Sequence, residues 1–257
     1  MIAVPEEVMA LLSDGAVHFF IVFLRTSAVV SVLPAFGERS VPMRVKLVLA
    51  LAFTLIVAPA VPTVPAPTTL IEAAGIIAGE IIVGLAFGLA IRLFVLALQT
   101  AGSIAAQSTS LAQLLGGAAA EPIPAMGYIL VVAGLALAVT LGLHVRAAEL
   151  IVYTYTLFPV GALPEGQILA AWGLQQVSHA FRLAFTLAAP FVIASMIYNL
   201  TLGVINRAMP QLMVAFVGAP VTTFGGLLVL FFAAPTMLQA WHTALSAFMA
   251  NPIGVAP

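Results

Sequence analysis

Three ionisable side chains interrupt the apolar run between residues 70 and 98, and they are the first candidates for chemistry. They are Glu72, Glu80 and Arg92, and Glu80 is the most central of them. A carboxylate in such a run is costly to bury, so it suggests a function, for instance in a proton or cation pathway. Glu80 and Arg92 point to different helical faces, so they cannot pair within one helix. Because a proton-coupled carrier usually holds several buried acids and this chain has few, we favour a structural role for Glu80, as a cap or a partner across an interface.

Motifs for catalysis or metal binding do not occur elsewhere in the sequence. The four histidines, His18, His144, His179 and His242, show no metal-ligand spacing, and the chain has no cysteine. Neither HExxH, GxSxG, GxGxxG nor a P-loop occurs. The sequence therefore nominates no nucleophile, no catalytic base, no metal site and no cofactor, and it predicts a protein that is not an enzyme.

An uncharged polar stripe comes after the apolar run. Gln99, Ser103, Gln107 and Ser110 recur at helical spacing, so they fall within about 80° on one face. Such a stripe could line water or hydrogen-bond to a polar neighbour, and both readings stay open. One function consistent with it is a small-solute or ion channel or carrier that uses Glu80 and the Gln99–Ser110 stripe.

The composition places these side chains in a membrane protein. Hydrophobic residues make up 63% of the chain and charged residues 7%, with a mean hydropathy of +1.21. Soluble proteins are about half apolar and about a quarter charged. The net charge of −1 leaves no basic face for nucleic acid, so partners are expected to be protein or membrane lipid. Glu6, Glu7 and Asp14 precede the first apolar run, so we expect no cleaved leader.

Six apolar segments can each supply about the 20 residues that a spanning helix needs. They lie near residues 17–36, 45–61, 70–98, 125–143, 174–205 and 212–247. Pro190, Pro220 and Pro235 predict kinks in the last two, and kinked helices need protein neighbours to satisfy the freed backbone groups. We predict an all-α polytopic membrane protein with kinked helices and helical hairpins, as one domain over residues 1–257.

A loop between the first two segments orients the chain. The stretch "FGERSVPMRVK" holds three of the eight cationic residues, Arg39, Arg44 and Lys46. By the positive-inside rule this loop is cytoplasmic. The N-terminus and the Pro-rich connection at 58–69 are then expected on the opposite side.

Two opposed glycine pairs mark the third segment. Gly75 and Gly79 form one GxxxG pair, and Gly84 and Gly88 form another about 180° away. The helix can therefore be packed closely between two others. Farther along, the small and apolar "LLGGAAAEPIP" at 114–124 reads as a loop, and Asn206, Arg207, Pro210 and Gln211 read as a polar turn between the last two segments.

Four stretches in order along the chain resemble the FliR family of flagellar type III export proteins, known as SctT in injectisomes. They are "FLRTSAVVSVLPAFGERSVPMRVKLVLALA" at 23–52, "GEIIVGLAFGL" at 79–89, "AAQSTSLAQLL…EPIPAMGYIL" at 105–130 and "NRAMPQ…GAP" at 206–220. Two positions depart from the family pattern. Met213 stands where an Asn is frequent, and Glu121 precedes Pro122 where an Asp or Asn is frequent.

The resemblance implies a gate subunit of the flagellar export apparatus in the bacterial inner membrane, within the basal body. It implies a FliP-like part over about residues 1–170 and a FliQ-like hairpin over about 171–257. Its partners would be FliP-like and FliQ-like subunits, an FlhB-like protein, rod proteins and unfolded export substrates, and neighbouring subunits could cover its apolar helices. The turn at Asn206 would contact one of these neighbours. A pore plug is implied at Gln107, Leu111, Leu114, Leu115, Gly116, Gly117 and Glu121.

Overall fold

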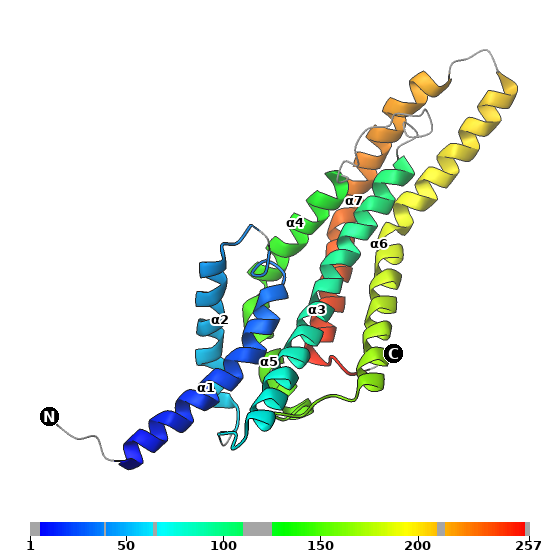
Figure 1. Cartoon of the computed structure of the whole chain (residues 1–257). Helices are drawn as coiled ribbons and strands as arrows, with labels where there is room; N and C mark the ends of the chain where they lie inside the picture. The colour runs from blue at the N-terminus through cyan, green and yellow to red at the C-terminus, as the bar shows by residue number, and fades with distance from the viewer. Residues whose placement is uncertain (1–5, 39, 64–65, 110–124, 210–213, 255–257) are drawn as a thin grey trace. The chain divides into compact units, whose positions relative to one another are not determined.

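The computed structural model describes residues 6–38, 40–63, 66–109, 125–209 and 214–254, with side chains described in these ranges except at 6–13, 109, 214–220 and 222. Within them the chain forms seven α-helices and one short 3-10 helix, with no strand (Figure 1). In order these are α1 (Glu6–Val32), α2 (Met43–Val57), η1 (Ala58–Ala60), α3 (Leu70–Thr109), α4 (Ala125–Thr140), α5 (Leu143–Leu157), α6 (Gly166–Ala208) and α7 (Val214–Ala250). The predicted all-α class is confirmed.

In the part of the chain that the structure describes, five helices are long and apolar enough to cross a membrane, or six if α4 and α5 together form one broken span. The prediction of a single segment over 125–143 missed α5 as a separate helix. Gly142 separates the two, because its φ of 88° belongs to the left-handed region that ends a right-handed helix. Helix α3 also extends through most of the polar stripe and ends at Thr109, well beyond the predicted end of the apolar segment near residue 98.

The chain divides into two compact units built from interleaved segments. The first comprises Met1–Arg92, Leu141–Gln176 and Ser246–Pro257, and the second comprises Leu93–Thr140 and Val177–Leu245. The long helices α3, α6 and α7 therefore contribute residues to both.

The first unit packs α1 against α2, the first half of α3, and α5. Val22 and Val29 of α1 are almost fully buried, as are Leu33 just after α1 and Ile151 of α5. In a membrane such side chains exchange lipid contacts for contacts with other helices, so close packing stabilises the arrangement more than removal from water does. Large aliphatic side chains thus hold the helices around the polar residues described below.

The second unit contains the antiparallel hairpin of α6 and α7, beside the second half of α3 and α4 (Figure 1). Trp241 of α7 is 1% exposed and donates its indole N–H to the backbone oxygen of Phe94 in α3, at 2.8 Å. The sequence predicted kinks at prolines, and Pro190 lies inside α6, which changes direction along its length in Figure 1.

Candidate functional site: a buried ion pair joining three helices

A charged pair lies in the core of the first unit, where α1 and α3 cross. Arg25 of α1 donates from Nε to Oε2 of Glu80 and from Nη2 to Oε1 of Glu80, both at 2.9 Å. Neither side chain is exposed to solvent. This fork of two parallel charge-assisted hydrogen bonds fixes the orientation of both groups.

Helix α5 and the segment after it complete the cluster. Tyr155 donates its hydroxyl to Oε2 of Glu80 at 3.2 Å, and the backbone N–H of Gly161 donates to Oε1 at 3.3 Å. The guanidinium of Arg25 lies 3.7 Å from the centre of the Tyr155 ring and donates to Thr154 Oγ1 at 3.3 Å. Each carboxylate oxygen of Glu80 thus accepts two hydrogen bonds, so the charge is balanced and satisfied inside the chain.

The sequence singled out Glu80 but missed its partner. Arg25 is the one Lys or Arg in the apolar run 17–36, so it was a candidate partner for Glu80, the most central acid of the run 70–98. As expected, Glu80 and Arg92 do not form an ion pair with each other, because Glu80 is paired with Arg25. Arg92 is instead directed to the end of α1, where it lies 3.8 Å from Glu38 and 3.5 Å from the backbone oxygen of Val32.

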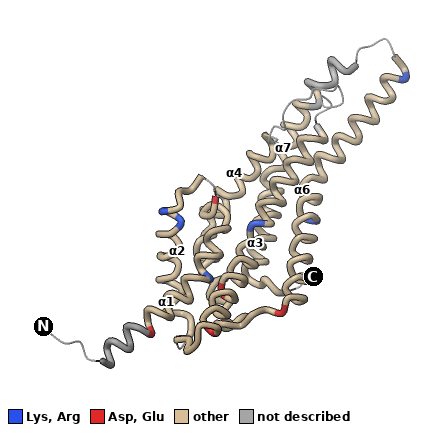
Figure 2. The backbone as a smooth tube through the Cα atoms, viewed as in Figure 1, with Lys and Arg blue, Asp and Glu red and all other residues tan. Residues whose placement is uncertain are grey.

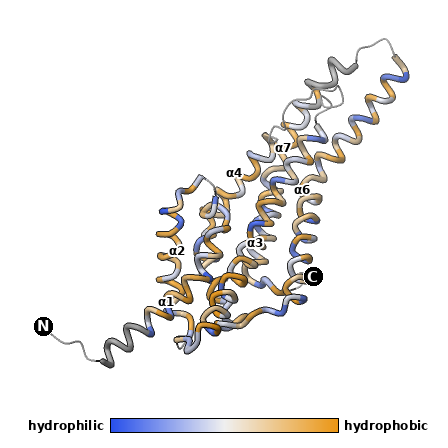
Figure 3. The backbone as a smooth tube through the Cα atoms, viewed as in Figure 1, coloured by the Kyte–Doolittle hydropathy of each residue, from blue (hydrophilic) through white to orange (hydrophobic). Residues whose placement is uncertain are grey.

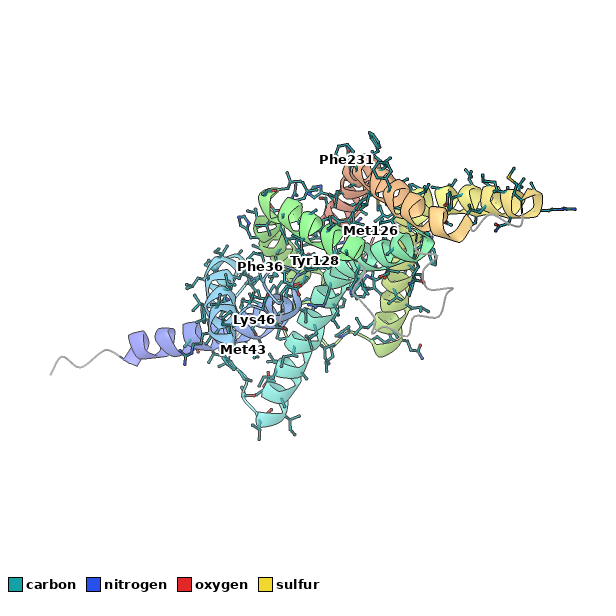
Figure 4. All side chains as sticks on the ribbon, turned by 90° about the horizontal axis from the view of Figure 1, so that it is seen from above. Phe36, Met43, Lys46, Met126, Tyr128 and Phe231 are labelled. Atoms are coloured by element: carbon teal, nitrogen blue, oxygen red, sulfur yellow. The ribbon has the colours of Figure 1, made fainter. Side chains whose placement is uncertain are left out.

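The cationic loop after α1 is partly used within the chain. Lys46 donates from Nζ to the backbone oxygen of Gly37 at 2.8 Å, in the turn just after α1. Figure 4 labels Lys46 and Phe36 around this turn, where the ring of Phe36 lies 6.1 Å from that of Phe53. Arg92 thus lies at the last backbone oxygen of α1, as cations at a helix C-terminus are expected to do, and Lys46 stabilises the turn that follows.

The two glycine pairs of α3 meet different surroundings. A Cβ at Gly84 would lie 2.5 Å from the backbone oxygen of Arg25, and one at Gly88 would clash with Val32, so this face packs closely on α1. A Cβ at Gly79 would lie at an ordinary 3.5 Å from the backbone of Ala162, and nothing lies within 4 Å of one at Gly75. One face is thus closely packed on a helix, whereas the other meets a connecting segment.

A further close contact in the second unit was not predicted. A Cβ at Gly102 of α3 would lie 2.6 Å from the backbone nitrogen of Gly127 in α4. The only signal in the sequence is that each of the two helices has a glycine there: Gly102 lies between Gln99 and Ser103, and Gly127 lies near the start of the next apolar segment. Spacing alone cannot show that two glycines on different helices meet.

The polar stripe lies on α3, with its amides outward. Gln99 and Gln107 are exposed, and Ser103 is half-buried with its hydroxyl donating to the backbone oxygen of Gln99 at 2.9 Å. Ser110 lies outside the described residues. The stripe therefore presents amide groups from an otherwise apolar helix.

Most of the predicted plug lies outside the described residues, namely Leu111, Leu114, Leu115, Gly116, Gly117 and Glu121, with only Gln107 inside them. Asn206 and Arg207, predicted to form a turn, instead lie exposed in the last turn of α6, which continues to Ala208. Pro210 and Gln211 lie outside the described residues.

Comparisons with known proteins agree with one another. The family model described as bacterial export proteins, family 1, matches residues 16–248. The flagellar biosynthetic protein FliR of Caulobacter vibrioides is 33% identical over 86% of this chain and 90% of its own length. The FliR proteins of Escherichia coli and Bacillus subtilis are 31% and 29% identical, over 81% and 79% of this chain and 81% and 80% of their own lengths.

Proposed function

Because this chain belongs to the bacterial export proteins, family 1, and is a component of the flagellar export apparatus, we propose that it is a gate subunit that helps to form and plug a protein-conducting pore. Its expected partners are FliP-like and FliQ-like subunits, an FlhB-like protein, rod proteins and unfolded export substrates. Its expected place is the inner membrane at the flagellar basal body. It would consist of a FliP-like part to about residue 170 and a FliQ-like hairpin thereafter.

The observation that carries the proposal is the exposed polar stripe on α3, together with the residues that come next in the chain. Gln99 and Gln107 are exposed on one face of an apolar helix, which suits a surface in contact with water. In the sequence, this helix is followed by the predominantly small and apolar stretch at 114–124. An exposed polar helix face, followed in the sequence by a predicted small and apolar loop, suits the wall and the plug of a pore.

The buried ion pair supports a rigid, structural part for the first unit. Arg25, Glu80 and Tyr155 join α1, α3 and α5, and both oxygens of the carboxylate are occupied. A small-solute carrier that uses Glu80 is not favoured, because such a carboxylate must exchange partners and this one has four hydrogen bonds within the chain. The relatives compared above are also flagellar proteins.

The α6–α7 hairpin supports contacts with neighbouring subunits. Its outer surface exposes many large apolar side chains, among them Phe185, Met196 and Leu200 of α6 and Phe231 of α7. Asn199 and Thr201 are exposed among the apolar residues of α6. Polar groups within apolar helices are typical of contacts between membrane helices. Asn206 and Arg207 at the end of α6 belong to the same proposed contact surface.

The plug is tested by replacing Leu111, Leu114 and Leu115 together with serine, which keeps the loop length. The variant, co-purified with the FliP-like and FliQ-like proteins of the same genome, is reconstituted in vesicles, and dye leakage is measured. We expect leakage to rise several-fold, because a polar loop no longer excludes water from the pore.

The matched control replaces Leu70 and Ile71 with serine. Both are strongly exposed at the opposite end of α3, so leakage should stay at the wild-type level. Unchanged leakage in the triple variant would contradict the plug, and a chain that purifies without either subunit would contradict the gate.

A further inference from the structure

The outer face of α2 in the first unit is aliphatic and uncovered, and one cation stands at its end. Its exposed apolar side chains, here named the α2 strip, are Met43, Val45, Leu47, Val48, Leu51, Ala52, Leu55 and Ile56. Val48 and Leu55 are 64% and 65% exposed. Figure 3 shows α2 as predominantly hydrophobic, and Figure 2 shows basic residues at one end of it.

Arg44 lies on the axis of this strip. Val48, Leu51 and Leu55 follow Arg44 by four, seven and eleven residues. At this helical spacing all four side chains share one face of α2. Arg44 is exposed, and among the described residues no acidic side chain forms an ion pair with it. By contrast, Arg92 is directed to the backbone oxygen of Val32 at the end of α1, and Lys46 to that of Gly37 in the turn after it.

The length of the strip corresponds to one leaflet of a membrane. At about 1.5 Å per residue, Arg44 and Ile56 are about 18 Å apart along the helix. The hydrocarbon core of a bilayer is about 30 Å thick, so one leaflet is about 15 Å. A cation at one end of the strip therefore lies where a phosphate headgroup would be when an acyl chain runs along the helix.

The composition of the strip favours lipid over a protein helix. Contacts between membrane helices are rich in small and polar residues, as at Gly84 and Gly88 where α3 meets α1. The exposed surface of α6 likewise includes Asn199 and Thr201. Apart from Ala52, the α2 strip contains only large apolar side chains, and it has no glycine, serine, threonine or amide side chain. We propose that the α2 strip and Arg44 together bind an anionic phospholipid, with the phosphate on Arg44 and an acyl chain along the strip.

Lipid retention by the natural assembly tests the site. The complex containing this chain is isolated by a tag from its own membrane, delipidated and titrated with phosphatidylglycerol or phosphatidylcholine, and bound lipid is counted by native mass spectrometry. Arg44→Gln should weaken binding of one phosphatidylglycerol about tenfold, as expected for loss of a charge-assisted hydrogen bond. Arg44→Lys should retain most of it, and Arg182→Gln, at an exposed cation on α6, should retain all of it. Equal binding by Arg44→Gln and wild type, or an equal loss of both lipids, would overturn the proposal.

A second measurement reports on the strip itself and does not require the Arg44 variants to assemble. Because the chain has no cysteine, Leu55→Cys can carry a single fluorophore within it, in a complex whose other subunits have had their cysteines replaced. Phospholipid with brominated acyl chains should quench this fluorophore at least twofold. Absence of quenching would mean that a protein subunit covers the strip, and the lipid site would be rejected.

Discussion

Arg25 and Glu80 each make the other's burial tolerable. An isolated charge moved from water into a protein interior costs several kcal/mol, and a pair recovers this only with good geometry and further hydrogen bonds. Here the geometry is a fork of two contacts at 2.9 Å, and Tyr155 and Gly161 supply further donors to Glu80. The loss of either charge should therefore be far more damaging than the loss of both.

The substitution Glu80→Gln tests this at the level of one residue. It leaves Arg25 buried without a counter-charge, so we expect the complex to lose about 3–5 kcal/mol of stability, measured as a lower temperature of thermal unfolding in detergent. Glu149→Gln is the matched control, since its partner Arg146 is on the surface and both side chains are more than half exposed. That change should cost less than about 1 kcal/mol.

The double replacement Arg25→Met with Glu80→Leu separates a structural role from a transport role. Two apolar side chains of similar size should restore most of the stability lost in Glu80→Gln. Export of flagellar proteins should return with it. A stable double variant that no longer supports export would show that the charges act directly, and the structural interpretation would fail.

Helix α3 shows how one element serves several contacts. Its Gly84–Gly88 face lies against α1, Gly102 lies against α4, and its exposed Gln99 and Gln107 face outward. The helix is 40 residues long, so its faces can have separate neighbours at separate heights. The effect of a substitution should therefore depend on the face on which it falls.

The substitutions Gly84→Ala and Gly75→Ala test how closely the two faces of helix α3 are packed. Alanine at Gly84 would place a methyl group 2.5 Å from the backbone oxygen of Arg25, so α1 and α3 must separate, at an expected cost of about 1–3 kcal/mol. Alanine at Gly75 meets open space and should stabilise the helix by up to about 1 kcal/mol. Both are measured by thermal unfolding of the same purified complex. Equal effects of the two would mean that the α1–α3 contact is looser than the structure shows.

At the scale of the whole molecule, the orientation of the chain in the membrane is testable. The positive-inside rule places the loop around Ser40 in the cytoplasm and the connection around Thr63 on the opposite side. Ser40→Cys and Thr63→Cys introduce single thiols at exposed positions of a chain without cysteine. A membrane-impermeant maleimide added to intact spheroplasts should label Thr63→Cys and leave Ser40→Cys unlabelled until the cells are opened. The reverse pattern would invert the predicted topology.

The sequence alone determined the class of the protein, because membrane helices satisfy their backbone groups locally and their apolar length is written in consecutive residues. It also indicated the family, the cost of Glu80 and the small-residue faces of α3. Arg25, at 55 positions from Glu80, and the pairing of Gly102 with Gly127 were decided by tertiary structure. A contact between helices depends on their rotation and crossing, and the spacing of residues within one helix carries no information about the angle at which another helix meets it.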